Sequence, residues 1–251
     1  SVATGDGVAM VHRAKGVIEN MEFIQFHPTS LYNPGERPSF LITEAMRGFG
    51  GLLRLQNGKE FMQKYHPMGS LAPRDVVARS IDHELKISGE EFVYLDITHK
   101  DRKEVMSHFP NIYKKCLSIG IDLTKDMIPV VPAAHYCCGG IKVNLNGESS
   151  IRRLYALGEA SSTGLHGGNR LASNSMMEAA VYADAAARHA ISVIDSIELQ
   201  RDIPAWDYEG TAVPEEMALI TQDYKEMQQI MTNYVGIVRS DVRLERAKRR
   251  L

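Results

Sequence analysis

Hydrophobic and polar positions along the chain follow, in turn, the two periods typical of strands and helices. Residues 22–26 alternate as in a half-buried strand, and we expect this strand to end at His27 and Pro28 and open into a loop. Apolar residues recur at helical spacing over 74–88, directly behind Pro73, which predicts a helix there. Because strand-like and helical segments interleave without repeats, the pattern indicates an α/β or α+β protein.

The remaining elements follow from the same patterns. Helices are predicted at 8–15, as two short segments between 100 and 120, and at 173–194, where Ser173 or Asn174 is the N-cap. Extended segments are predicted at 91–97, 128–131, 139–143 and 154–158, and turns at Asn57–Gly58 and Asn146–Gly147.

Composition narrows the class of protein. With 44% hydrophobic and 24% charged residues, the chain has the make-up of a folded globular protein. A net charge of −2 argues against a general nucleic-acid or membrane-surface binder. The chain has no long apolar run and no signal-peptide pattern at its start, so we expect a cytoplasmic protein without a membrane partner. Three cysteines without CxxC spacing indicate neither a disulfide framework nor a metal site.

Several polar residues lie where a packed core would not favour them. They are His27, Thr43, Glu44, Arg74, His135 and Arg170. Each has a structural alternative: a core histidine, an ordinary capped helix start for Thr43–Glu44, or a surface arginine. The Gly-rich loop 164–170 is either a flexible turn or, because it leads into a helix, a site that offers N–H groups to an anion or an electron-rich ring.

Taken together, these stretches resemble the succinate dehydrogenase and fumarate reductase flavoprotein superfamily, in the same order and over residues 1–200. The motifs are TGDG at 4–7, QFHPT at 25–29, LITEAMRG at 41–48, LAPRD at 71–75, HYCCGG at 135–140, YALGE at 155–159 and HGGNRLASNS at 166–175. Within the superfamily, PAAHYCCGG at 132–140 and RLASNS at 170–175 are most similar to the L-aspartate oxidases.

The resemblance implies a function and a set of roles. The implied reaction is FAD-dependent oxidation of L-aspartate to iminoaspartate in the quinolinate branch of NAD biosynthesis. Hydride passes from C2 to flavin N5, and the electrons pass to oxygen or fumarate. The implied ligands are L-aspartate and related four-carbon dicarboxylates, with quinolinate synthase as a further partner. By position, Arg74 transfers the proton, His27, Thr43, Glu44, His135 and Arg170 bind the substrate, and Asp6, Glu159, Ser175 and Met176 bind FAD.

The chemistry of these side chains is compatible with most of the roles. Two carboxylates need several donors, and arginine offers a planar fork that matches a carboxylate, while His and Thr donate at shorter reach. Ionised Glu44 cannot donate, so we expect it to orient a neighbouring cation. Free arginine stays protonated near neutral pH, so proton transfer by Arg74 calls for a second cation or a polarised water nearby.

In fold terms, the resemblance implies an α+β capping domain together with part of a Rossmann-like FAD-binding domain and the start of a helical domain. The expected segments are FAD-binding at 1–17, capping at 18–130, FAD-binding again at 131–200 and helical at 201–251.

The chain departs from the superfamily pattern in three respects. No G-x-G-x-x-G fingerprint occurs, so we expect an internal fragment that is inactive alone. Phe49 replaces the usual Glu, and Gly168 the usual Ala. Two alternative interpretations of the chain remain: a fragment of a succinate dehydrogenase or fumarate reductase flavoprotein, and a non-catalytic binding module.

Overall fold

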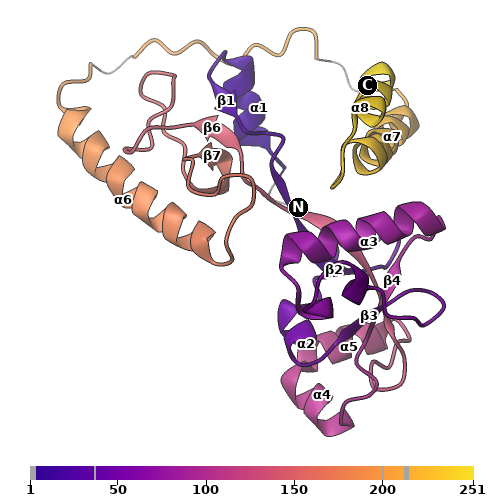
Figure 1. Ribbon diagram of the computed structural model, residues 1–251. Coiled ribbons are helices and arrows are strands. Elements are labelled where there is room, and N and C mark those ends of the chain that lie inside the picture. Colours follow the sequence, from indigo (N-terminus) through magenta and orange to yellow (C-terminus); the bar gives the residue numbers. More distant parts are fainter. Residues whose placement is uncertain (1–3, 37, 199–200, 212–214) are drawn as a thin grey trace. The chain divides into compact units, whose positions relative to one another are not determined.

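The computed structural model describes residues 4–36, 38–198, 201–211 and 215–251. Two compact units make up the chain, Ser1–Ile191 and Ser192–Leu251. Within the first unit the strands form two sheets, one of four strands and one of three (Figure 1). Antiparallel pairing and helices between the strands confirm the predicted α+β class.

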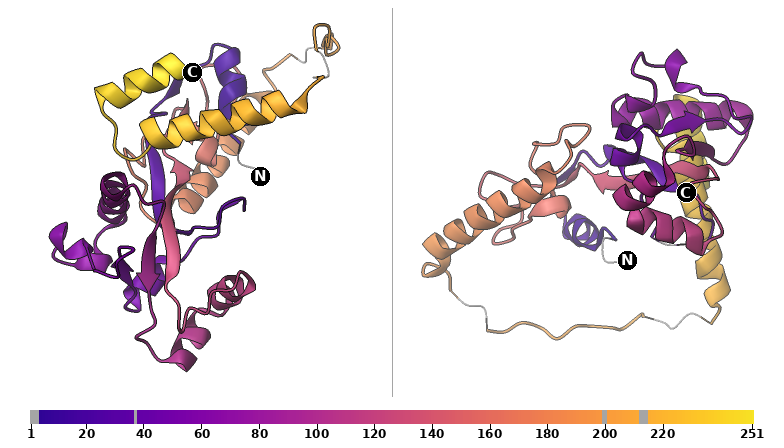
Figure 2. Two further views of the ribbon diagram at one scale, coloured as in Figure 1. Left: turned by 90° about the vertical axis from the view of Figure 1, so that its right-hand side faces the viewer. Right: turned by 90° about the horizontal axis from the view of Figure 1, so that it is seen from below.

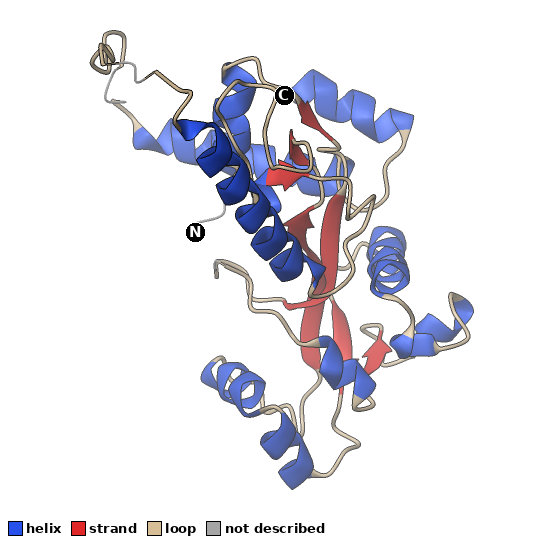
Figure 3. Cartoon of the chain, turned by 90° about the vertical axis from the view of Figure 1, so that its left-hand side faces the viewer, coloured by secondary structure: helices blue, strands red, loops and turns tan. Residues whose placement is uncertain are grey.

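The four-stranded sheet has the order β2-β5-β4-β3, with every neighbouring pair antiparallel. Its strands are β2 (Ile24–Leu31), β3 (Leu52–Arg54), β4 (Val93–Asp96) and β5 (Ile128–Cys137). Figure 3 shows the two longest strands, β2 and β5, side by side in the sheet. This pair carries two of the predicted site histidines.

Strand β2 is longer than the pattern predicted. It continues through His27 and Pro28 to Leu31, so the prediction that it ends at His27 was wrong. The register against β5 shifts between His27 and Ser30, which marks an irregularity of the β-bulge kind. Proline lacks the N–H that a regular ladder needs and is tolerated at such an irregularity, so Pro28 does not end the strand.

Two further extended segments differ from the prediction. The segment predicted at 128–131 is the start of the much longer β5. The segment at 154–158 forms only an isolated bridge at Tyr155, and the strand lies further on, as β7 (Ser161–Ser162). Gly158, with φ of 63°, interrupts the extended backbone and begins a 3-10 turn, η3 (Gly158–Ala160).

The three-stranded sheet has the order β1-β6-β7. Strand β6 (Gly140–Lys142) lies between β1 (Ile18–Glu19), to which it is antiparallel, and β7, to which it is parallel. The helices α1 (Asp6–Arg13) and α6 (Asn174–Ile194) belong to this part of the unit. Its small apolar cluster is built from Val11, Ile141 and Ala156.

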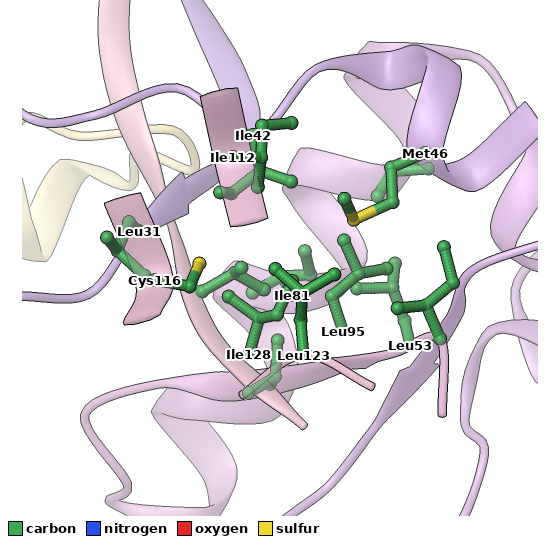
Figure 4. Close-up of a cluster of buried hydrophobic side chains, with 14 of the residues drawn as sticks. Leu31, Ile42, Met46, Leu53, Ile81, Leu95, Ile112, Cys116, Leu123 and Ile128 are labelled. Carbon is green, nitrogen blue, oxygen red and sulfur yellow. The ribbon is translucent and has the colours of Figure 1, made fainter. Parts of the chain in front are cut away.

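Helices and apolar side chains complete the core around the four-stranded sheet. The helical elements are α2 (Glu44–Gly48), η1 (Met62–Lys64), η2 (Gly69–Leu71), α3 (Arg74–Ser88), α4 (Arg102–His108) and α5 (Pro110–Ser118). Figure 4 shows the buried cluster, which includes Leu31, Ile42, Met46, Leu53, Ile81, Leu95, Ile112, Cys116, Leu123 and Ile128. This packing holds α2 and α3, which carry further site residues, against the sheet.

Helix α3 agrees with its prediction. Pro73 is the N-cap residue and lies just before the first turn, and Gly89 ends the helix in a left-handed conformation with φ of 77°. The two short helices between 100 and 120 are also confirmed, as α4 and α5. Helix α6 begins at Asn174, behind Ser173 with φ of 70°.

The second unit contains α7 (Met217–Tyr234) and α8 (Asp241–Arg250), which pack as a pair (Figure 2). Ile230 and Ala247 are the buried residues of these two helices. Nowhere in the described residues is a helix both long and apolar enough to cross a membrane. Cys116, Cys137 and Cys138 are free thiols. The described residues also hold no cluster of three or more metal-ligating side chains.

Candidate functional site

Two predicted site histidines face each other from the paired strands β2 and β5. The ring centroids of His27 and His135 lie 5.5 Å apart, with the planes inclined by 69°. The backbone pairs His27 with Ala133, so the register of this strand pair brings His135 close to it. His27 is buried and His135 half-buried. The antiparallel pairing therefore unites residues more than a hundred positions apart.

His27 is a neutral donor in this environment. Burial, followed by the charges of His135, Arg74 and Arg47, lowers the pKa of His27 from 6.5 to about 4. The N–H of Thr29 donates to Nδ1 of His27 at 3.3 Å. A neutral imidazole that accepts at Nδ1 carries its proton on Nε2, so this atom is available to donate to a ligand.

The predicted proton-transfer residue, Arg74, meets a carboxylate. Arg74 is the first residue of α3, and its Nε donates to Oε2 of Glu44, the first residue of α2. The other oxygen of Glu44 forms an ion pair with Nη2 of Arg47 at 3.3 Å. One carboxylate thus contacts two guanidinium groups, which is the geometry that the expected orienting role of Glu44 requires.

Arg47 is a candidate residue that the sequence analysis missed. It is buried to 1% exposure, and its Nη1 donates to the Ser70 carbonyl at 2.8 Å, while Nε has no hydrogen-bond partner in the described residues. Burial lowers the pKa of Arg47, and the charge of Arg74 adds to this, while Glu44 opposes it. Its spacing of three residues from Glu44 in one helix was the available signal.

Thr43 acts as the N-cap of α2. Its Oγ1 accepts the N–H of Ala45 at 3.3 Å, as in the ordinary capped helix start that we had kept as an alternative. A threonine hydroxyl both donates and accepts, so the cap leaves its O–H free to donate. The side chain is exposed, next to the Glu44 carboxylate in sequence.

His135 is electrostatically coupled to both arginines of the predicted site. Burial lowers its pKa, as do the charges of Arg170 and Arg74, while Glu159 opposes the shift. The pKa of His27 responds to Arg74 in the same way. The charge of Arg74 therefore acts on both histidines, and that of Arg170 acts on His135.

Arg170 is buried without an ion-pair partner among the described residues. Its Nη2 donates to Oε1 of Gln25 at 2.8 Å and its Nη1 to Oγ of Ser175 at 3.2 Å. The guanidinium lies 4.4 Å from the ring centre of Tyr136, and Nε has no partner in the described chain. A buried cation with only neutral partners favours an anionic ligand.

Gln25 was also missed by the sequence analysis. Besides accepting from Arg170, its Nε2 donates to Oδ1 of Asn169 at 2.8 Å and to the Arg170 carbonyl at 2.6 Å. It is 3% exposed. A polar amide inside a strand of the QFHPT motif was the signal that could have found it.

The four predicted FAD-binding residues lie on three elements that pack closely together. A Cβ built on Gly7 would lie 3.9 Å from Ala160, and one on Gly158 would lie 3.6 Å from Ala179. These contacts join α1, which begins at Asp6, to η3, which holds Glu159, and η3 to α6, which holds Ser175.

The chemistry of this cradle fits FAD. One carboxylate oxygen of the exposed Glu159 accepts the N–H of Cys137 at 3.0 Å, and the second suits sugar hydroxyls. The amino end of the 21-residue α6 provides N–H groups and a positive dipole end. Met176, 79% exposed, offers an apolar surface beside it.

Of the two positions at which the chain carries an unusual residue, Phe49 has a local structural explanation and Gly168 has none. The Phe49 ring packs against Phe109 and His108, at centroid distances of 5.5 Å and 4.6 Å. Phe49 therefore contributes to packing where a glutamate would contribute charge. A Cβ on Gly168 would lie 3.6 Å from the Phe23 ring, which is ordinary contact, so the loop has room for alanine.

Comparison with known proteins identifies relatives along the entire chain. It is 50% identical over 248 residues to L-aspartate oxidase of Pseudomonas aeruginosa, covering 99% of this chain and 46% of that protein. With L-aspartate oxidase of Acinetobacter baylyi it shares 52% identity over 250 residues, covering 100% and 46%. The fold matches a variant of E. coli quinol fumarate reductase with a TM-score of 0.74 and 32% identity, covering 97% of this chain and 46% of that one.

The chain spans about half the length of the curated relatives it matches. The family model described as "FAD binding domain" matches residues 1–176, which include every predicted site residue. FAD is accordingly the cofactor of the family, in agreement with the donor set around α6. The chain belongs to this FAD-binding family of flavoprotein oxidoreductases, and within it is similar to the L-aspartate oxidases throughout.

Proposed function

We propose that this chain provides the dicarboxylate site of an FAD-dependent L-aspartate oxidase, which converts L-aspartate to iminoaspartate. One observation carries the proposal: Arg170 is buried and has no carboxylate partner in the described residues. Its charge acts on His135, and the charge of Arg74 acts on both His135 and the neutral donor His27. A four-carbon dianion needs several donors spread over two carboxylates, and this group supplies them. Identity of 50% and 52% to L-aspartate oxidases supports the choice of substrate.

The side chains divide the work by charge. Arg170 forms a bidentate contact with one carboxylate, and the neutral His27 and half-buried His135 donate single hydrogen bonds. Thr43 donates through the hydrogen that its capping role leaves free. An ionised carboxylate cannot donate a hydrogen bond to a substrate oxygen. Glu44 instead accepts from Nε of Arg74 and so holds the Arg74 side chain in place.

Arg74 takes part in the transfer of the proton that the substrate amino group releases. Aspartate loses a hydride from C2 and a proton from its amino group, and the imine product keeps both carboxylates. The Glu44 carboxylate between Arg74 and Arg47 gives that proton a route away from the substrate. When bound, FAD would supply the hydride acceptor, with oxygen or fumarate as the final acceptor of the electrons.

The proposed flavin contacts are those of the cradle around α6. Glu159 accepts from sugar hydroxyls, and Asp6 faces the same ligand from the first turn of α1. Ser175 and Met176, at the amino end of α6, would contact the flavin, and the dipole of the helix would favour negative charge there. With this assignment we propose the division into FAD-binding (1–17, 131–200), capping (18–130) and helical (201–251) segments.

Substitution of Arg170 tests the clamp. In the FAD-loaded protein, Arg170→Leu should weaken succinate and aspartate binding by about 2–5 kcal/mol, since a buried carboxylate loses its charged partner. The matched control is Arg188→Leu in α6, an arginine whose side chain is 78% exposed and pairs with Asp184. Titration of the flavin absorbance measures both, and equal affinities for the two variants would refute the clamp.

A second candidate, succinate oxidation or fumarate reduction, is favoured by the likeness to the fumarate reductase. The dicarboxylate clamp serves either reaction. Anaerobic reduction of the flavin by aspartate, compared with reduction by succinate at equal occupancy, decides between them. Reduction by succinate alone would replace L-aspartate oxidation as the proposed function.

A further inference from the structure

Successive contacts between buried side chains connect α6 with the guanidinium of Arg170. Glu178, whose side chain is 1% exposed, contacts Nε2 of His166 at 2.7 Å. His166 in turn lies edge-on to Tyr136, with ring centroids 5.4 Å apart and planes inclined by 87°. The face of Tyr136 carries the Arg170 guanidinium at 4.4 Å. None of Glu178, His166 and Tyr136 has a part in the proposed reaction.

Each contact restricts the next group. Glu178 also accepts the hydroxyl of Thr163, so its carboxylate is held from two sides and cannot rotate freely. It accepts the proton on Nε2 of His166, which fixes the imidazole plane. The Tyr136 hydroxyl lies 3.4 Å from the same nitrogen, so a change of ring position would meet the fixed imidazole.

The last contact matters because Arg170 has few other restraints. Its two amino nitrogens bond to neutral groups, Gln25 and Ser175, and its Nε has no partner in the described chain. A guanidinium stacked on an aromatic face has its plane set by the ring, and the plane decides whether the fork meets a carboxylate in two parallel hydrogen bonds.

We propose that Tyr136 is a positioning residue for dicarboxylate binding: its ring sets the plane of the Arg170 guanidinium, and the His166–Glu178 pair holds that ring in place. The proposal rests on the proposed function, because it assigns a partner to the clamp arginine. It predicts that loss of the aromatic face weakens dicarboxylate binding without removing any group that touches the ligand.

A matched pair of substitutions separates the effect of the aromatic ring of Tyr136 from the effect of its hydroxyl. Tyr136→Phe keeps the ring, and Tyr136→Leu removes it. In the FAD-loaded protein, Tyr136→Leu should raise the Kd for succinate about 2- to 30-fold, the range of a cation–π contact from exposed to desolvated sites, whereas Tyr136→Phe should stay close to wild type. The limiting rate of flavin reduction by aspartate should change less than the Kd in both variants.

General destabilisation is controlled by Ile81→Ala, which removes core volume from α3. If the Kd followed stability alone, this variant would weaken succinate binding as Tyr136→Leu does, and the proposal would be overturned. Equal weakening by Tyr136→Phe and Tyr136→Leu would overturn it as well, since the hydroxyl and not the ring would then be responsible.

A second pair of substitutions tests whether Glu178 and His166 hold the Tyr136 ring in place. Glu178→Gln retains an oxygen that accepts from His166, and Glu178→Leu does not. We expect succinate affinity near wild type for the glutamine variant and a rise in Kd for the leucine variant. Equal affinities would remove Glu178 and His166 from the proposal. If Glu178→Leu does not fold, His166→Leu takes its place in the comparison, and a Kd equal to that of wild type has the same consequence.

The outcomes distinguish this inference from the proposed function. A wild-type protein that binds no succinate refutes both. Succinate binding that depends on Arg170 but is unchanged in Tyr136→Leu refutes the positioning role and leaves the clamp intact.

Discussion

At the scale of single residues, charge state decides what each side chain of the site can do. His27 is kept neutral by burial and by the cations around it, with a pKa lowered from 6.5 to about 4. The Glu44 carboxylate contacts both Arg74 and Arg47. The site thus combines fixed positive charges with a neutral donor, which suits a dianion.

The depressed pKa of His27 makes stability sensitive to acid. Because the unfolded chain binds this proton at pH 6.5 and the native state only near 4, stability falls as the pH drops through this window and is fully present above 6.5. Between pH 7 and 4.5 we expect wild type to lose about 2 kcal/mol more than His27→Gln, from a shift worth about 1.36 kcal/mol per unit. Urea unfolding at the two pH values measures this, and parallel losses would contradict the assignment.

The substitution Arg74→Lys separates binding from chemistry. Lysine keeps the positive charge, so succinate affinity should remain within a few-fold of wild type. Flavin reduction by aspartate should fall by about 10²–10⁴-fold, the loss typical of a displaced acid or base. Anaerobic stopped-flow measures the rate, and Arg79→Lys, an exposed neighbour paired with Asp75, is the control. A normal limiting rate with weak binding would make Arg74 a clamp residue only.

At the scale of elements, helix starts deliver the site residues. Helix α2 begins at Glu44 behind its cap Thr43, and α3 begins at Arg74 behind Pro73. The start of α3 was predicted from local signals and agrees with the structure, whereas a capped helix start at Thr43–Glu44 was only one of two alternatives. The meeting of Glu44 with Arg74 depends on the core that packs both helices on the sheet.

The cap of α2 allows a stability effect to be told from a binding effect. Thr43→Ala should cost about 1 kcal/mol of unfolding free energy by removing the cap. Asp101→Ala should cost a similar amount, because Asp101 caps α4 by accepting from Lys103 and Glu104 at 2.9 Å and 3.1 Å. Only the Thr43 variant should also weaken succinate binding, as measured by flavin titration. Unchanged binding would confine Thr43 to its capping role.

Helix α3 owes its position to one buried face. Ile81 is fully buried and Ile87, on the same helix, is 69% exposed. Ile81→Ala should therefore lower the unfolding free energy by about 2–5 kcal/mol, while Ile87→Ala should stay within about 0.5 kcal/mol of wild type. Denaturant unfolding compares the two, and similar losses would mean that α3 does not pack as described.

At the scale of the molecule, the connection between the two sheets of the first unit has little room. Strand β5 passes into β6 through Cys138 and Gly139, and a Cβ on Gly139 would lie 2.1 Å from the Asn20 carbonyl oxygen. The N–H of Cys138 donates to the Phe23 carbonyl at 2.9 Å across the same crossing. Backbone contacts around Gly139 therefore leave no space for a side chain at this position.

The substitution Gly139→Ala tests this crossing. We expect a loss of several kcal/mol in unfolding free energy and weaker succinate binding, because the shift separates Gln25 and Arg170, which come from the two sides of the crossing. Gly48→Ala is the control, since its Cβ meets nothing within 4 Å and its φ is ordinary. That variant should be neutral or more stable by about 0.4–1 kcal/mol. Equal stability of both variants would contradict the close contact.

The sequence by itself determined the local elements with clear signals and named most of the residues of the candidate site. Periodicity and capping located α3, α4, α5 and α6, and the motifs singled out His27, Glu44, Arg74, His135 and Arg170. Local signals failed where long-range pairing overrides them: β2 continues through Pro28, and the extended run at 154–158 yields to Gly158.

Only the tertiary structure decided which of these residues meet and in what state. The pairing of β2 with β5 sets the distance between His27 and His135, and burial among arginines sets the pKa of His27. Local signals mark Arg47 and Gln25 as candidates, but their contacts with Ser70 and Arg170, and the contact of Tyr136 with Arg170, join residues on different elements and follow from the tertiary structure alone. A motif names the groups that chemistry requires, whereas packing of remote segments determines their distances, charges and partners.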